Sequence, residues 1–120
     1  MWISIQTKRV NISPRMRRKI EDFIDRLFER ERRYVGSVVI SIRPATLGPD
    51  VGYACRITLW SHYLGLTVVS DCGDTIRTAV QQAALRSRQV IRQRLHKRRS
   101  KTRRMTRGRL NRSFSRTARE

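Results

Sequence analysis

The chain has 120 residues, with 28 Lys or Arg against 9 Asp or Glu, so its formal net charge is +19. That length is enough for one domain with a modest core. No apolar run approaches the roughly 18 residues of a membrane-spanning helix, and no apolar targeting segment follows the N-terminus. The sequence therefore predicts a cytoplasmic protein with no membrane partner. The charge favours a polyanion instead, because most of the cations are arginines, whose guanidinium groups grip phosphate through two hydrogen bonds.

The first part of the chain predicts a strand and then a helix. Residues 2–7 (WISIQT) alternate apolar and polar side chains, which is typical of a strand. Ser13 suits the N-cap of a helix, and Pro14 suits its first position. The apolar residues then recur with the helical period: Met16, Ile20, Phe23, Ile24, Leu27 and Phe28. One reading of the exposed face is a solvated surface on which acids and arginines pair, for example Asp22 with Arg26; the other is a surface that binds RNA.

Three further strands are predicted in the middle of the chain, at residues 37–43, 53–60 and 64–70. A loop over 44–52, with two prolines and two glycines, should separate the first two of these strands, and the last two should form a hairpin. Alternation places Trp60 on the face opposite Tyr53. Trp60 could then pack at an edge or dimer contact, or it could stack on a base.

A second helix should follow a turn at residues 71–74 (DCGD), with Asp74 as its N-cap. Its inner face consists of Ile76, Ala79, Val80, Ala83, Ser87, Val90 and Ile91. Past about residue 97 the chain is strongly basic and has no apolar period, so we expect a folded domain over 1–97 and a disordered tail over 98–120. The order β-α-β-β-β-α fits an α+β two-layer sandwich, a four-stranded sheet with two helices on one face.

The second helix is the most cationic part of the predicted domain, with no acid after Asp74. Because successive helical residues turn by about 100°, one polar stripe carries Arg77, Arg88, Arg92 and Arg99. Arg94 and Arg98 replace the apolar stripe after Ile91. We therefore expect the helix to outrun the sheet beyond about residue 92, where RNA phosphates could surround it. The alternative is a basic end that only aids solubility.

The sequence contains few features that would indicate an enzyme. Cys55 and Cys72 form no CxxC pair, and with two histidines they make a poor zinc site. No glycine-rich phosphate loop precedes a helix, and no nucleophile has an evident base. We expect no catalytic residues, no metal, no cofactor and no small-molecule substrate.

Two segments resemble a known family. MWISIQTKRVNISPRMRRKIEDFIDRL is similar to the opening strand, helix start and first helix of the ribosome hibernation-promoting and ribosome-associated inhibitor family, and GDTIRTAVQQA is similar to the start of its second helix. The likeness spans about residues 1–97. It implies a non-catalytic protein that binds the small ribosomal subunit and its rRNA in the channel of messenger and transfer RNA, stopping translation under stress. No segment resembles the second, dimerisation domain of longer members, so the resemblance is to the short type.

The resemblance also points to particular residues. Arg17 and Arg26 match basic positions of the family's first helix, and Arg86 matches one in its second, whereas Arg77 stands where the family usually has an aromatic residue. With the helical stripes, the predicted RNA-binding set is Arg17, Arg26, Arg77, Arg86, Arg88, Arg92, Arg94, Lys97, Arg98 and Arg99. The alternative functions are a general RNA-binding module or RNA chaperone acting off the ribosome, or a structural protein of a large ribonucleoprotein.

Overall fold

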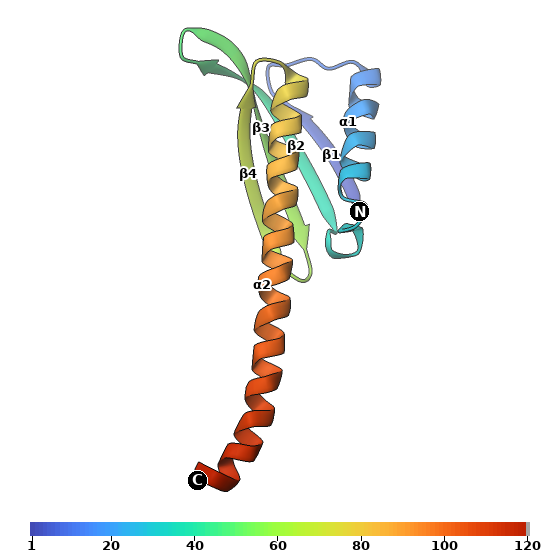
Figure 1. The fold of residues 1–120 in the computed structure, drawn as a ribbon. Helices are drawn as coiled ribbons and strands as arrows, with labels where there is room; N and C mark the ends of the chain where they lie inside the picture. The colour runs from blue at the N-terminus through green and yellow to red at the C-terminus, as the bar shows by residue number, and fades with distance from the viewer. Residues whose placement is uncertain (120) are drawn as a thin grey trace.

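The computed structural model describes the backbone of residues 1–119 and the side chains of residues 1–46 and 48–98. Within these residues the elements are β1 (Trp2–Thr7), α1 (Pro14–Leu27), the 3-10 turn η1 (Arg32–Tyr34), β2 (Ser37–Leu47), β3 (Asp50–Ser61), β4 (Gly65–Gly73) and α2 (Ile76–Arg119). The strands form one sheet in the order β1-β2-β3-β4, and both helices lie on one face of it (Figure 1). The predicted α+β two-layer sandwich is confirmed.

The first helix begins as its sequence predicts. Ser13 is the N-cap, and its hydroxyl accepts a hydrogen bond from the backbone N–H of Met16 at 3.1 Å. Pro14 occupies the first helical position, where its missing N–H costs nothing. Ile20, Ile24 and Phe28 face the sheet and are buried. The helix carries the chain across the sheet, so β1 pairs with β2 in parallel, whereas the other strand pairs are antiparallel.

The core lies between the helices and the inner face of the sheet. The alternating residues of β2 and β3 supply the largest share of it: Val38, Ile40, Ile42, Cys55, Ile57 and Leu59 are each at most 1% exposed. The inner face of α2 contributes small residues, Ala79, Ala83, Ala84 and Ser87, together with the larger Val80, Ile91 and Leu95. Small side chains let the helix axis approach the sheet closely, so α2 is seated on β3 and β4 along several turns.

The loop predicted over 44–52 is wrong in extent, because β2 and β3 continue through most of it. Their pairing runs to Leu47 and Asp50, which leaves Gly48 and Pro49 to make the turn. Gly48 has φ +62°, a conformation that favours glycine. Pro44 is tolerated inside β2 because β1 ends opposite Ile42, so β2 has a neighbouring strand on one side only at this point.

The sequence predicted Asp74 as the N-cap of α2, and this prediction is wrong. β4 continues to Gly73, and the cap is Thr75. The Thr75 hydroxyl accepts a hydrogen bond from the N–H of Thr78 at 3.0 Å, and the Thr75 carbonyl accepts one from the N–H of Ala79 at 3.0 Å. Threonine is a common N-cap residue, so the shift by one position follows from the extra strand residues.

The second helix stays on the sheet longer than expected. Leu95 is only 6% exposed, and Arg94 and Arg98 contact the sheet's end, so packing continues past residue 92. Beyond Arg98 the helix continues past the end of the sheet to Arg119 (Figure 1). The predicted disordered tail over 98–120 falls almost wholly on residues whose side chains lie outside the described part, and the boundary at 97 stays a prediction. None of the described helices is long and apolar enough to cross a membrane.

The close approach of α2 to β4 gives a first prediction, at Gly73. A Cβ at this position would lie 2.6 Å from the backbone nitrogen of Ala79 and 2.9 Å from the carbonyl carbon of Thr78. Because neither backbone atom can give way alone, Gly73→Ala should lower the free energy of unfolding by about 2–3 kcal/mol, measured by urea denaturation. Gly36→Ala is the control, since its Cβ would meet nothing closer than 3.4 Å. Equal losses for the two variants would contradict the packing described.

Candidate nucleic-acid interface

A groove of about 670 Å³ lies between the N-terminal halves of α1 and α2. Its apolar lining consists of Met16, Ile20, Phe23, Ile76 and Val80. Arg15 and Lys19 line it from α1, and Arg77 lines it from α2. Cations from two different helices therefore gather around one apolar hollow.

The same two helix borders carry further arginines toward the other end of the molecule. Arg26 follows Arg15 by eleven residues, and Arg88 follows Arg77 by the same interval, which is about three helical turns. Both pairs consequently stay on the borders of α1 and α2 that face each other. Within the described part of the chain, Arg26, Arg77 and Arg88 make no ion pair and no side-chain hydrogen bond. Their guanidinium groups are available to an outside anion.

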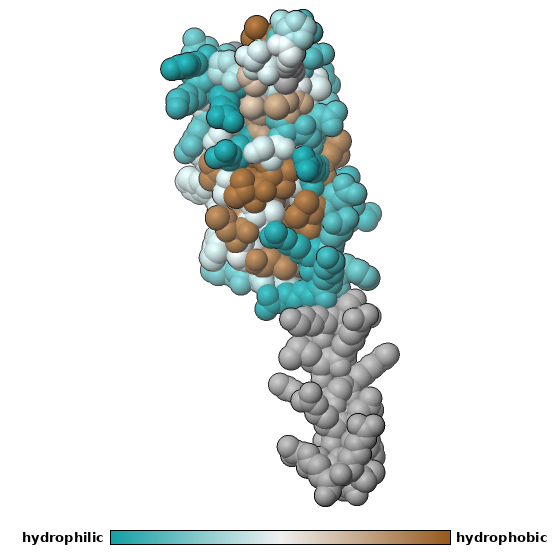
Figure 2. Space-filling view, turned by 90° about the vertical axis from the view of Figure 1, so that its left-hand side faces the viewer, coloured by the Kyte–Doolittle hydropathy of each residue, from teal (hydrophilic) through white to brown (hydrophobic). Residues whose placement is uncertain are grey.

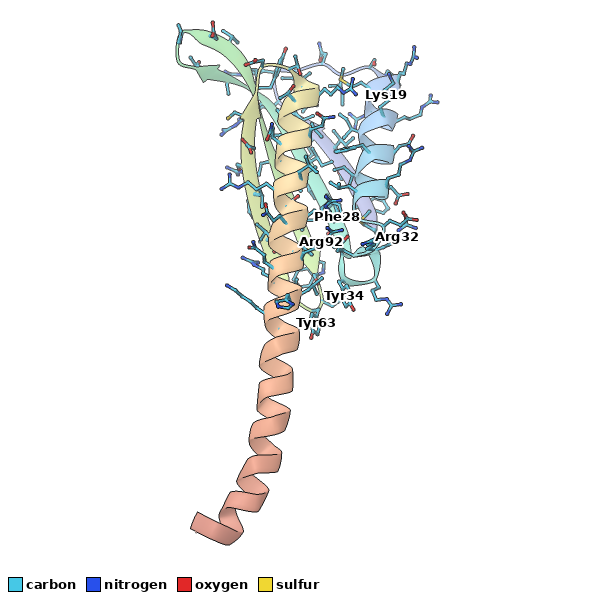
Figure 3. All side chains as sticks on the ribbon, in the orientation of Figure 1. Lys19, Phe28, Arg32, Tyr34, Tyr63 and Arg92 are labelled. Atoms are coloured by element: carbon cyan, nitrogen blue, oxygen red, sulfur yellow. The ribbon has the colours of Figure 1, made fainter. Side chains whose placement is uncertain are left out.

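Arg92 has a different position, because it is paired with a buried acid. Its Nε donates to Oε1 of Glu31 at 2.6 Å, and the Glu31 side chain is only 6% exposed. Figure 3 shows Arg92 of α2 reaching toward the segment after α1 that holds Phe28 and Arg32. Glu31 Oε2 is buried too and has no hydrogen-bond partner among the described residues. Arg92 thus supplies the counter-charge of a buried carboxylate whose second oxygen has no hydrogen-bond partner among the described residues. Its main role is therefore to link α2 to the segment that follows α1.

Arg94 and Arg98 anchor α2 to the β3–β4 end of the sheet. Nη1 of Arg94 donates to the hydroxyl of the buried Thr67 at 2.7 Å. Nη1 of Arg98 donates to the carbonyl of Tyr63, and its guanidinium carbon lies 4.1 Å from the centre of the Tyr63 ring. Tyr63 in turn meets Tyr34 with ring centres 6.0 Å apart (Figure 3). These arginines satisfy local acceptors first, although each guanidinium keeps other N–H donors that could reach RNA.

Two more predicted residues are tied to strand edges. Nη1 of Arg17 donates to the carbonyl of Ile5 in the edge strand β1 at 2.9 Å. Nη1 of Arg86 donates to the carbonyl of Ser70 in the other edge strand, β4, at 3.3 Å. Lys97 is exposed and makes no side-chain contact of this kind in the described part of the chain. The side chain of Arg99 lies outside that part.

The ten predicted residues therefore do not form one cluster. Arg26, Arg77 and Arg88 share the interhelical border, Arg92 supports that border from within, and Arg86, Arg94 and Arg98 contact the sheet side of α2. Sequence reasoning left Arg15 and Lys19 out of the site, although both line the groove. Their interval of four residues along the border of the apolar face was the signal that could have found them.

The two helices differ in their acids. On α1, Asp25 pairs with Arg32 at 2.7 Å, while the expected pair of Asp22 with Arg26 does not form between the described side chains. Over its whole length of 44 residues, α2 contains no acid. Positive charge is therefore more concentrated along α2 than along α1, which carries acids among its cations.

The fold is similar to that of two solved structures. A ribosomal subunit interface protein from Coxiella burnetii is 13% identical, with a TM-score of 0.64, and the match covers 78% of this chain and 96% of that chain. The N-terminal domain of Thermus thermophilus Protein Y is 16% identical, with a TM-score of 0.61, covering 78% of this chain and 98% of that chain. No family model and no curated protein matches the sequence. The predicted resemblance to the hibernation-factor family is confirmed at the level of the fold.

Nothing in the described side chains gathers three or more potential metal ligands. Of the two cysteines, Cys72 is exposed and Cys55 is buried. Burial, with the nearby Asp71 carboxylate adding to it, raises the pKa of the Cys55 thiol to about 12. Cys55 consequently behaves as a core residue.

The ion pair of Arg92 gives a prediction about stability. Arg92→Met should lower the free energy of unfolding by about 1–3 kcal/mol, because it leaves Glu31 buried without its counter-charge. Adding Glu31→Gln to that variant should recover part of the loss in a double-mutant cycle followed by urea denaturation. Arg88→Met, which breaks no ion pair or side-chain hydrogen bond among the described residues, is the matched control. A cost for Arg92→Met no larger than that of the control would contradict the role given to the pair.

The two thiols should differ in reactivity, since the thiolate is the reacting form. At about pH 8 an aromatic disulfide reagent should label Cys72 at once and Cys55 only after unfolding, as followed by absorbance. The folded pKa of Cys55 lies above its ordinary value of 9.0, so its contribution to stability is complete below pH 9 and is lost as the pH rises toward 12. Two thiols labelled at the same rate in the native protein would refute this assignment.

Proposed function

We propose that the chain is a non-enzymatic ribosome-binding factor that uses the interhelical border of α1 and α2 to hold rRNA of the small subunit. The fold it shares with a ribosomal subunit interface protein supports this choice of partner. The observation that carries the proposal is a helix of 44 residues without an acid, whose Arg77 and Arg88, with Arg26 of α1, make no ion pair among the described residues. A folded domain gains nothing in stability from such a concentration of one charge. A polyanion that surrounds it would offset the repulsion.

The shape of the molecule suits a channel between RNA walls. Its principal extents are 67 × 31 × 17 Å, so it is a flat wedge continued by the rod of α2. Because both helices lie on one face of the sheet (Figure 1), their cations can contact phosphates along one wall of a narrow passage. We therefore place it in the channel used by messenger and transfer RNA, where its presence would block translation and hold the ribosome in a resting state.

The helices would bind by charge rather than by reading sequence. Arginines three turns apart on each helix can contact phosphates along an RNA backbone, with each guanidinium able to donate two parallel hydrogen bonds. The apolar groove beneath Arg15, Lys19 and Arg77 adds a place where an unstacked base could enter. No step of bond making is involved, so inhibition would follow from occupancy alone.

The test is cosedimentation with small ribosomal subunits at physiological salt. The unaltered protein should migrate with the subunits, and a triple variant, Arg26→Gln, Arg77→Gln and Arg88→Gln, should bind at least about tenfold more weakly. Because three phosphate contacts are removed, the slope of log affinity against log salt should fall by about 2–3. These three residues make no ion pair or side-chain hydrogen bond among the described residues, so the variant should remain folded.

A matched control removes the same charge elsewhere: Lys8→Gln, Arg18→Gln and Arg33→Gln, all at exposed positions. Equal weakening by both triple variants would mean that net charge, and not the interhelical border, provides the affinity. Equal affinity for unrelated bare RNA and for intact subunits would favour a general RNA-binding module acting off the ribosome.

A further inference from the structure

The open face of the sheet carries both tryptophans of the chain in one cross-strand row. In the sheet register Trp2 pairs with Ser37, Ser37 with Trp60, and Trp60 with Leu66. Paired residues on neighbouring strands point to the same face, so these four side chains lie in a line across all four strands. Trp2 is 71% exposed, Trp60 44% and Leu66 61%.

The rows that follow change from apolar to cationic. The second row is Ser4, Val39, Thr58 and Val68, the third is Gln6, Ser41, Arg56 and Ser70, and the fourth contains Arg43, Ala54 and Cys72. None of these four rows contains an acid. Figure 2 looks onto the β4 edge of the sheet and shows apolar side chains gathered there among hydrophilic ones. The face thus joins an aromatic end to an arginine-bearing end.

Trp60 is held in a fixed position on this face. The backbone of Gly36 lies directly against it, so that a Cβ on Gly36 would be 3.4 Å from Cδ1 of the indole. The His62 ring meets the indole edge-on, with ring centres 5.8 Å apart and an interplanar angle of 66°. Ser37, the small residue between the two tryptophans, leaves the space between the indoles open. The Trp60 ring is therefore presented to solvent in a defined position, with the more exposed Trp2 in the same row.

We propose that the open face of the sheet binds single-stranded RNA, with unpaired bases stacked on Trp60 and Trp2. Aromatic side chains on a four-stranded sheet are a known way of stacking unpaired bases. Arg56 and Arg43 on the same face lie where the phosphates of the bound strand would run, and the hydroxyls of Ser37 and Thr58 can exchange hydrogen bonds with ribose 2′-hydroxyls. This site goes beyond the helical border and does not depend on the ribosome being the partner.

The charge on this face argues against a second copy of the chain as its occupant. Pairing two such faces would enclose Arg43 and Arg56 of both copies between sheets with no acid in the four rows to meet them. Removing an unpaired cation from water costs several kcal/mol. The net charge of +19 on each copy opposes the contact further. RNA carries negatively charged phosphates, which suit the arginine-bearing end of the face, and flat bases, which suit the aromatic end.

The tryptophans make the proposal directly measurable. Because Trp2 and Trp60 are the only tryptophans in the sequence, selectively excited indole fluorescence reports on this face. Adding an unstructured oligouridylate of about eight nucleotides to the full chain should quench the fluorescence, while the anisotropy of a labelled oligonucleotide reports total binding. RNA should bind more tightly than DNA of matching length and base composition. The helical triple variant should keep the quench.

Substitutions separate stacking from general attraction. Trp60→Ala should weaken the binding seen by quenching of Trp2 by about 5- to 150-fold, the range found for loss of one stacked base, and Trp60→Phe should recover part of it. Val51→Ala is the matched control, since Val51 is an apolar residue of β3 that is 80% exposed but lies outside the four rows. Circular dichroism of each variant checks that the sheet is intact.

Three outcomes would overturn the proposal. Oligonucleotide binding by anisotropy without indole quenching would place the RNA elsewhere, on the helices. Equal affinity for RNA and DNA would overturn the assignment to RNA. A molecular mass that rises with protein concentration in the absence of RNA, and falls in Trp60→Ala, would make the face a contact between copies. Failure of ribosome cosedimentation with a retained quench would refute the proposed function alone.

Discussion

The close seating of α2 on β3 and β4 determines where the α2 cations of the candidate interface lie, and how near they come to those of α1. Gly73 lets the helix start against the strand, and Ala79, Ala83 and Ser87 keep the two backbones close over the following turns. Small side chains line the first turns of this seam, whereas Ile91 and Leu95 fill it further along. The exposed positions of the helix carry mainly arginine and glutamine, and no acid. A larger residue on the seam would lift the helix and move the arginines of its border away from those of α1.

Arginine has two separate tasks in this chain. Three arginines of α2 donate hydrogen bonds to other elements: Arg92 to Glu31, Arg94 to Thr67 and Arg98 to Tyr63. These bonds hold the later turns of α2 against the rest of the domain. Arg26, Arg77 and Arg88 have no such internal partners in the described structure. This division explains how a helix with no acid of its own can remain seated. The anchoring arginines find acceptors on other elements, and solvent and ions relieve the repulsion among the remaining ones.

The fold was predictable because it depends on how apolar residues repeat along short segments of the sequence. Alternation marked the inner faces of β2 and β3, and the i, i+4 pattern marked the buried stripe of α1, so element order and layers followed. The extension of β2 through Pro44 was missed because the tolerance of proline depends on β1 ending opposite Ile42, a fact of sheet register. The role of Arg92 was missed for a similar reason. Its partner is 61 residues away in sequence, and an arginine on a polar stripe looks the same whether it meets an RNA phosphate or a buried glutamate.

The two faces of the domain differ in the kind of free energy they can offer to RNA. The helical border offers charge, whose contribution comes mainly from counterions released by the RNA and declines steeply as salt rises. The outer face of the sheet offers two indoles, whose stacking on bases is far less sensitive to salt because it depends on contact between uncharged rings. An RNA held on both faces would therefore retain a residual affinity at high salt that the arginines cannot supply. A domain enclosed by RNA on two sides would use both terms together, the charge to gather the partner and the stacking to fix where unpaired bases lie.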